Sequence, residues 1–313
     1  MLIEKVACVG AGLIGHSWVA LFVMKGYQVD VQDVNEDLLV RAFNWIRSDL
    51  SFLAEEGLIT RRDAEKAIGR MTMTTDISEA VSEADYVQES VFEDYKDKKR
   101  VFGIVDAAAP REAILASSTT GLLMTEIQKA AKKPERCIVA HPWNPPLLIP
   151  LVELVPGAKT SSETVKTVYE FMKKLGKIPV VLRKEVPGFI GNRLQIAVWR
   201  EAISLVDRGV ASVEDVDKAL CAGPGIRWAM MGPNLTLHLG GGEGGMEYLI
   251  KHIGPTYSQV WSDMDNWTKI PPSAAKKITE GVKKMDITRG RTMEELVKWR
   301  DRKLMKLVKI LYQ

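Results

Sequence analysis

Two hydrophobic patterns divide this chain into an alternating part and a helical part. Up to about residue 182, short apolar runs alternate with stretches whose apolar residues recur at helical spacing. Strands that alternate with helices predict a Rossmann-type, doubly wound α/β fold, in which helices cover both faces of a mostly parallel sheet. The strands are expected at residues 6–9, 27–32, 71–74, 86–89, 114–117, 137–140, 151–155 and 180–182.

The strand signals stop at residues 186–188, Val-Pro-Gly, and helical spacing follows. Glycine and proline are dense over residues 223–233, which predicts a loop there. We therefore expect an α/β domain over residues 1–186 and an all-helical domain over residues 187–313. Helices of the second domain are expected at residues 191–209, 213–221, 246–253, 256–264, 272–284 and 292–311.

Composition limits the class of protein. Of 313 residues, 46% are hydrophobic and 27% are charged, which is enough for a folded core and excludes a disordered chain. The formal charge of +3 is too balanced to favour nucleic acid or a membrane surface. Cys8, Cys137 and Cys221 show neither metal nor disulfide spacing, and no signal-peptide pattern is found. We expect a cytoplasmic protein without a metal ion.

The first strand runs directly into Gly10-Ala11-Gly12-Leu13-Ile14-Gly15, and a helix follows. Gly10 permits the tight turn, Gly12 lets a pyrophosphate approach the backbone, and Gly15 lets the helix pack against the strand. The free N–H groups at the start of the helix favour phosphate. We expect Leu13 and Ile14 to contact the cofactor together with the three glycines.

The second strand ends at Asp33, which can hydrogen-bond both hydroxyls of a ribose. A carboxylate there repels the 2′-phosphate of NADP, and the next basic residue is Arg41. The pattern therefore predicts NAD as the cofactor.

His141 is the histidine best placed for chemistry. It ends a strand at the carboxyl edge of the predicted sheet, where open α/β sheets hold their ligands. Glu153 lies within the next apolar strand, where an unpaired carboxylate would be expensive. A His–Glu pair would fix the imidazole tautomer and suits general acid–base catalysis. On spacing alone, a structural histidine and an edge-strand glutamate are equally open.

Five motifs give the chain a family resemblance. They are Gly10 to Gly15, Ser117-Ser118-Thr119-Thr120, His141-Pro142-x-Asn144-Pro145, Leu151-Val152-Glu153 and Val186-Pro187-Gly188-Phe189-Ile190-x-Asn192-Arg193. In this order and at these separations they resemble the 3-hydroxyacyl-CoA dehydrogenase superfamily. Further motifs, such as Gln88-Glu89 and Trp299-Arg300-Asp301, are similar to its branch of lambda-crystallin and L-gulonate 3-dehydrogenase.

The resemblance implies roles for individual residues. His141 and Glu153 match the catalytic pair, and Asn192 matches an asparagine that holds the reacting oxygen. Thr120 stands where the family usually has a serine that bonds the substrate oxygen, so the hydroxyl is kept and a methyl is added. Trp143 is bulkier than the residue expected in the gulonate branch.

The same resemblance places Glu93 and Lys98 along the cofactor, although a solvated helix start is equally open for Lys98. It also implies a homodimer formed through the helical domain. The expected activity is NAD-dependent oxidation of the 3-hydroxyl of a small hydroxy acid, similar to L-gulonate 3-dehydrogenase. The alternatives are a 3-hydroxyacyl-CoA dehydrogenase, such as one acting on 3-hydroxybutyryl-CoA, and a non-catalytic crystallin-like or nucleotide-binding protein.

Arg227 is a candidate for recognising the substrate. It lies in the Gly- and Pro-rich segment between Ile226 and Trp228, where a guanidinium needs an anionic partner. A planar guanidinium can hold the carboxylate of a free acid through two parallel hydrogen bonds. An arginine paired with a protein carboxylate at a dimer interface is equally open.

Overall fold

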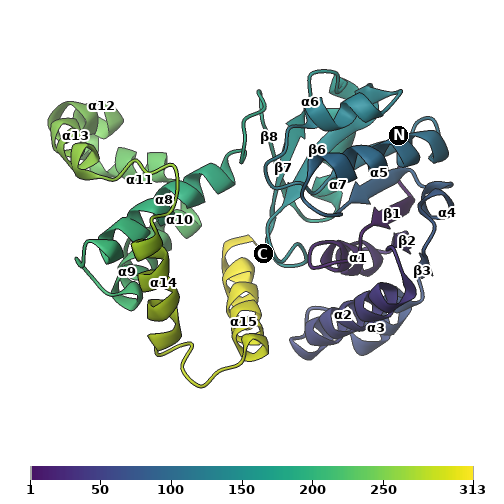
Figure 1. Ribbon diagram of the computed structural model, residues 1–313, viewed down its shortest axis with the longest axis horizontal. Coiled ribbons are helices and arrows are strands. Elements are labelled where there is room, and N and C mark those ends of the chain that lie inside the picture. Colours follow the sequence, from purple (N-terminus) through teal and green to yellow (C-terminus); the bar gives the residue numbers. More distant parts are fainter. Residues whose placement is uncertain (1, 313) are drawn as a thin grey trace. The chain divides into compact units, whose positions relative to one another are not determined.

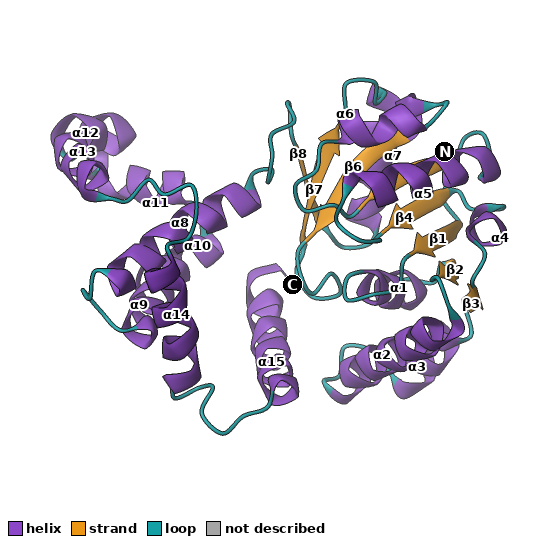
Figure 2. Cartoon of the chain, in the orientation of Figure 1, coloured by secondary structure: helices purple, strands orange, loops and turns teal. Residues whose placement is uncertain are grey.

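The computed structural model describes residues 2–312, which fall into two compact units divided between Asn192 and Arg193. The first unit is the expected α/β fold, and the second is helical (Figure 2). The fold class predicted from the sequence is confirmed. The domain boundary expected after residue 186 lies shortly before this division and remains a prediction.

The first unit is built on an eight-stranded sheet with the order β3-β2-β1-β4-β5-β6-β7-β8. Strands β1 to β6 are parallel, whereas β7 runs antiparallel to β6 and parallel to β8. The strands are β1 (Lys5–Val9), β2 (Gln28–Gln32), β3 (Met71–Thr74), β4 (Tyr86–Glu89), β5 (Ile114–Ser117), β6 (Cys137–Pro142), β7 (Leu151–Pro156) and β8 (Ile178–Val181).

Helices cover both faces of this sheet (Figure 1). Val6 and Cys8 of β1 join one apolar cluster, and the alternate residues Ala7 and Val9 join the other, as the two-residue period of a strand requires. The helices of the first cluster are α1 (Gly15–Met24), α2 (Glu36–Glu55), α3 (Arg61–Ile68) and α7 (Ser162–Lys174). Those of the second are α4 (Ile77–Val81), α5 (Tyr95–Ala108) and α6 (Met124–Ile127), followed by the 3-10 turns η1 (Gln128–Ala130) and η2 (Pro134–Arg136).

Side-chain caps set the start of most of these helices. Asn35 accepts a hydrogen bond from the backbone N–H of Leu38 at the start of α2, as its sequence position predicts. Asp94 caps α5 in the same way through the N–H of Asp97. Helix α1 begins without a side-chain cap. The first N–H groups of α1 are therefore free of side-chain caps, as an anion site at a helix start requires.

The second unit consists of helices and their turns. They are α8 (Gly191–Asp207), whose first two residues belong to the first unit, α9 (Val213–Leu220), η3 (Cys221–Gly225), α10 (Ile226–Met230), α11 (Pro233–Gly240), η4 (Gly242–Gly244), α12 (Gly245–His252), α13 (Gly254–Asp263), α14 (Pro272–Lys284) and α15 (Met293–Tyr312).

The prediction of a loop over residues 223–233 is wrong. Pro224 lies inside the π-helical turn η3, which leads directly into α10. Pro233 occupies the first position of α11, where its missing N–H would have no helical partner in any case. Glycine and proline thus lie within a helical turn or at the start of a helix here, and they do not form a loop.

Candidate active site

The glycine loop after β1 has the geometry that the motif predicts. Gly10 has φ +88°, and a Cβ on it would lie 2.8 Å from the carbonyl oxygen of Ser90. A Cβ on Gly15 would lie 1.9 Å from the carbonyl oxygen of Gly10, so only glycine fits either position. Gly12 instead faces open space, with nothing within 4 Å of where its Cβ would be. This space at the start of α1 fits a pyrophosphate.

Asp33 stands beside the same loop. Its Oδ2 accepts a hydrogen bond from the N–H of Ala11 at 2.9 Å, and its Oδ1 accepts one from Val34 at 2.7 Å. The acid expected at the ribose therefore also holds the glycine turn. His16 holds the other side of the turn, since its Nδ1 lies 2.8 Å from the carbonyl oxygen of Gly12. These residues fit a dinucleotide cofactor.

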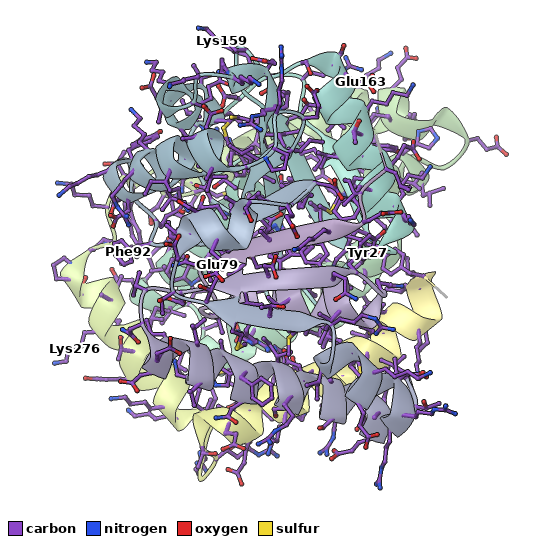
Figure 3. All side chains as sticks on the ribbon, turned by 90° about the vertical axis from the view of Figure 1, so that its right-hand side faces the viewer. Tyr27, Glu79, Phe92, Lys159, Glu163 and Lys276 are labelled. Carbon is purple, nitrogen blue, oxygen red and sulfur yellow. The ribbon has the colours of Figure 1, made fainter. Side chains whose placement is uncertain are left out.

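The site lies along one edge of the sheet. The glycine loop, Asp33, Glu93 and Thr120 follow β1, β2, β4 and β5, and His141 lies near the end of β6. Figure 3 shows the labelled Phe92, in the loop after β4, at the opposite end of the strands from Tyr27, which precedes β2. This is the carboxyl edge, where open α/β sheets bind ligands.

His141 and Glu153 form a buried pair. They stand directly opposite each other in the antiparallel register of β6 and β7, and His141 Nδ1 lies 2.8 Å from Glu153 Oε2. Their side chains are 5% and 1% exposed. Because Nδ1 faces Glu153, the imidazole offers Nε2 for exchanging a proton with a substrate hydroxyl.

The start of α8 completes the setting of Glu153. The N–H groups of Ile190 and Gly191 donate to its Oε1 at 2.8 and 3.0 Å. Burial alone would raise the pKa of the Glu153 carboxyl, but the hydrogen bonds from His141, Gly191 and Ile190 and the charge of the imidazole lower it. The carboxylate is therefore ionised at neutral pH and can balance an imidazolium.

Trp143, which is bulkier than the residue expected from the gulonate branch, lies against this pair. Its Nε1 is 3.4 Å from Glu153 Oε2, and its ring centroid is 6.4 Å from that of His141. A Cβ on Gly191 would lie 2.5 Å from the indole, so the absence of a side chain at Gly191 makes room for the ring. The indole is half-buried and brings an aromatic surface to the His141–Glu153 pair.

Thr120 and Asn192 are joined within the first unit. The side-chain Nδ2 of Asn192 donates to the carbonyl oxygen of Thr120 at 2.9 Å. The Thr120 hydroxyl and Glu93 Oε1 are 3.0 Å apart. The two residues expected to hold the reacting oxygen are thus brought together, and their role toward the substrate remains a proposal.

Lys98 is not part of a solvated helix face. Its side chain is 1% exposed, and its Nζ forms ion pairs with Glu89 at 2.8 Å and with Glu93 at 3.4 Å. In the sequence, Glu89 stands out only as part of a family motif. The signal that could have identified it is an acid that ends a buried strand and so needs a partner.

Arg227 lies in the second unit, on α10 and exposed to solvent. Its role in binding the substrate remains a prediction. Among residues 2–312, no group of three or more His, Cys, Asp or Glu side chains is arranged to hold a metal ion. No helix in the described part of the chain is long and apolar enough to cross a membrane.

A dinucleotide-binding loop and a buried His–Glu pair at the same edge of a sheet are features expected of a nicotinamide-dependent dehydrogenase. The family described as "3-hydroxyacyl-CoA dehydrogenase, NAD binding domain" matches residues 5–186, and its C-terminal domain matches residues 188–281. The chain belongs to the 3-hydroxyacyl-CoA dehydrogenase family. It is an oxidoreductase that uses NAD and acts on a CH–OH group.

Individual relatives extend this likeness over almost the whole chain. An L-carnitine dehydrogenase of Nocardiopsis dassonvillei is 39% identical over 99% of this chain and 92% of its own length. One from Bacillus cereus is 40% identical over 99% of this chain and 93% of its own length. The solved structure of an NAD-dependent 5-formyl-3-hydroxy-2-methylpyridine 4-carboxylic acid 5-dehydrogenase is 31% identical, with a TM-score of 0.85 and 99% of each chain covered.

Proposed function

We propose that this enzyme oxidises the 3-hydroxyl of a small free hydroxy acid that carries a quaternary ammonium group, with L-carnitine as the first candidate. The observation that carries the chemistry is the 2.8 Å contact between His141 Nδ1 and Glu153 Oε2. The printed names of the relatives support the substrate class. The gulonate specificity expected from the motifs rests on those motifs alone and is the alternative to be tested.

Residues of the chain accept the hydroxyl proton and bind the substrate oxygen. His141 accepts the hydroxyl proton at Nε2, and the ionised Glu153 stabilises the resulting imidazolium. Thr120 and Asn192 orient the oxygen and stabilise its charge as the carbonyl forms or is reduced. When bound, NAD supplies the hydride acceptor. We propose Gly10, Gly12, Leu13, Ile14, Gly15 and Asp33 as its binding residues.

Trp143 supports the choice of a quaternary ammonium substrate. An aromatic face attracts such a cation through its ring quadrupole, by about 0.5–2 kcal/mol depending on desolvation. A polyhydroxy acid such as gulonate gains nothing comparable from an indole face.

A substrate panel tests this function. L-carnitine, L-gulonate, 3-hydroxybutyrate and 3-hydroxybutyryl-CoA are each offered with NAD, and NADH formation is followed by its absorbance. We expect turnover of L-carnitine with the highest kcat/KM. Turnover of the thioester alone would contradict the free-acid proposal, and NADH binding without turnover of any substrate would favour the non-catalytic alternative.

Substitutions at Trp143 test the aromatic contact. Trp143→Leu should raise KM for L-carnitine by about 3- to 30-fold, because the cation loses its aromatic face. Trp143→Phe keeps an aromatic ring and serves as the matched control, with a KM near that of the wild type. An equal loss with 3-hydroxybutyrate, which lacks the ammonium group, would show that the indole only fills space.

A further inference from the structure

His16 is the second residue of α1, and it holds the glycine loop from the protein side. Its backbone N–H donates to the carbonyl oxygen of Gly12 at 3.0 Å, and its Nδ1 lies 2.8 Å from the same oxygen. Because a carbonyl oxygen only accepts, Nδ1 carries the proton of this hydrogen bond. One residue therefore supplies two donors to one carbonyl, which fixes the direction in which the Gly12 carbonyl points.

The Gly12 carbonyl and the N–H of Leu13 belong to the same peptide group. This peptide is trans, so the two groups point in opposite directions. With the carbonyl turned toward His16, the N–H of Leu13 is turned away from the imidazole. Within residues 2–312 this N–H donates to no other backbone group, and the Cβ position of Gly12 beside it faces open space. A donor placed in this way fits a phosphate oxygen.

Helix α2 holds the imidazole of His16 in place. Trp45 of this helix lies against the ring, with ring centroids 5.0 Å apart and planes at 47°. One turn further along α2, Asp49 Oδ2 lies 3.5 Å from His16 Nε2. The imidazole thus has the Gly12 oxygen at one nitrogen and a carboxylate at the other, and the residue is only 9% exposed. These contacts leave the ring a single orientation.

The imidazole of His16 is neutral at neutral pH. Burial lowers its pKa from the usual 6.5, and the hydrogen bond to Gly12 opposes this more weakly. The charged groups on this side are Asp49, whose contact is too long for a strong hydrogen bond, and Arg41, which lies 4.8 Å from the ring centroid of Trp45. A neutral imidazole with its proton on Nδ1 still donates to Gly12. The hydrogen bond, and not a positive charge, is what this residue brings to the loop.

We propose that His16 is a positioning residue for the cofactor, which sets the Gly12–Leu13 peptide so that the N–H of Leu13 is ready for the pyrophosphate of NAD. Glycine leaves the backbone of the loop free to turn, so this peptide needs a partner that holds it. His16 acts through the peptide and not by contact with the cofactor. The inference rests on the proposed binding of NAD at the glycine loop and not on the choice of substrate.

His16→Leu is the first test, and His16→Asn is its matched partner. The two new side chains have nearly the same size and shape, but only asparagine places an N–H donor one bond from Cγ, where His16 has Nδ1. We expect His16→Leu to raise the Kd for NADH about 3- to 10-fold, the range for one lost hydrogen bond. His16→Asn keeps the donor and should stay within about 2-fold of wild type. Fluorescence titration without substrate measures both.

Two further measurements separate this role from a general disturbance of the structure. The loss in His16→Leu should be equally large for ADP-ribose, which keeps the pyrophosphate and lacks the nicotinamide, as measured by calorimetry. With saturating NAD, kcat should stay within about 2-fold of wild type, because the cofactor is then bound in both enzymes. His252→Leu is the control, since His252 is an exposed histidine of α12 in the second unit, and it should leave the NADH Kd unchanged.

The pH dependence distinguishes a hydrogen bond from a charge. The NADH Kd of His16→Leu divided by that of the wild type should stay constant between about pH 7 and 9, where a histidine with a lowered pKa is neutral. A ratio that falls as the pH rises would show that an imidazolium attracts the phosphates, and it would overturn the inference. Equal Kd values for His16→Leu and His16→Asn would overturn it as well.

The remaining variants keep the test decisive. If His16→Leu does not fold, His16→Ala replaces it in the comparison with His16→Asn. Gly12→Val puts a side chain into the open space, and an unchanged NADH Kd in this variant would mean that the pyrophosphate binds elsewhere, so that the inference fails. If the wild-type enzyme oxidises no 3-hydroxy acid, the proposed function fails, and the affinities for NADH and ADP-ribose still decide the role of His16.

Discussion

The two units differ in how far their apolar side chains are buried. In the first unit, strand residues such as Val87 and Leu115 are buried between two layers of helices. In the second unit, Trp199, Trp228 and Trp261 are 49%, 40% and 68% exposed. An α/β unit with helices on both faces of its sheet covers its own apolar surface, whereas the helical unit leaves much of its own uncovered.

This difference shows where the geometry of the site comes from. The His–Glu pair, the glycine loop and the ion pairs of Lys98 with Glu89 and Glu93 all lie inside the first unit. The helical unit instead exposes apolar side chains, and an apolar surface of this kind is expected to pack against a partner. A homodimer through this unit remains our proposal, and sedimentation equilibrium would test it against the chain mass of 34.9 kDa.

The largest effect is expected in the first unit, at the pair proposed to be catalytic, His141 and Glu153. His141→Gln should lower kcat by ~10²–10⁴-fold, because the proton acceptor is lost, and leave NADH affinity unchanged. Glu153→Gln should also lower kcat, since all four groups that contact this carboxylate are donors and an amide cannot accept from all of them. Steady-state kinetics and NADH titration measure both. Near wild-type kcat in either variant would disprove the assignment.

The next effect tests whether the helical unit takes part in recognition. Arg227→Met should raise KM for a free hydroxy acid roughly 10- to 100-fold, the range for losing a charge-assisted bond to the carboxylate. NADH affinity should not change. Arg208→Met is the matched control, since Arg208 already pairs with Asp263 in the same unit. An unchanged KM, or loss of the dimer without an effect on substrate, would reject the carboxylate role and leave recognition to the first unit.

A smaller effect concerns cofactor choice. Asp33→Ala should weaken NAD binding by about tenfold, through the lost ribose bonds, and narrow the gap to NADP. The structure adds that Asp33 also holds the N–H of Ala11. Asp33→Asn is the matched variant, because it keeps an acceptor for Ala11 but loses the charge that repels the 2′-phosphate. Comparable kcat/KM for NAD and NADP in the wild-type enzyme would contradict the assignment.

Local signals were enough to predict the glycine loop, Asp33 and the strands that carry His141 and Glu153. These follow from hydrophobic periodicity and from the steric needs of Gly10 and Gly15. The antiparallel direction of β7, which sets His141 opposite Glu153, depends on how β7 pairs with β6, and hydrophobic periodicity does not give the direction of a strand. The burial of Lys98 is of the same kind, since its partner Glu89 belongs to a neighbouring element. Such contacts leave no periodic trace in the sequence.

The last effect we predict is on stability and not on activity, and it concerns Lys177, another buried group of the first unit that the sequence did not reveal. Its side chain lies against Trp18 of α1, with Nζ 5.6 Å from the ring centroid, and donates to the carbonyl oxygens of Pro146 and Ile149. These carbonyls belong to the loop that joins His141 to Glu153. Burial, and to a lesser degree the charge of Lys25, lowers the pKa of Lys177 to about 7.

The sign of the pH dependence follows from this shift. In the unfolded chain the pKa of Lys177 is about 10.4, so between about pH 7 and 10 unfolding takes up a proton. The stability that this group contributes therefore rises with pH across that window, by at most about 1.4 kcal/mol per pH unit. The wild-type Tm minus that of Lys177→Met should grow from pH 7 to pH 9. The same difference for Lys174→Met, an exposed neighbour, should stay constant. A constant difference for Lys177 as well would mean that the ammonium keeps its charge between Pro146 and Ile149 throughout.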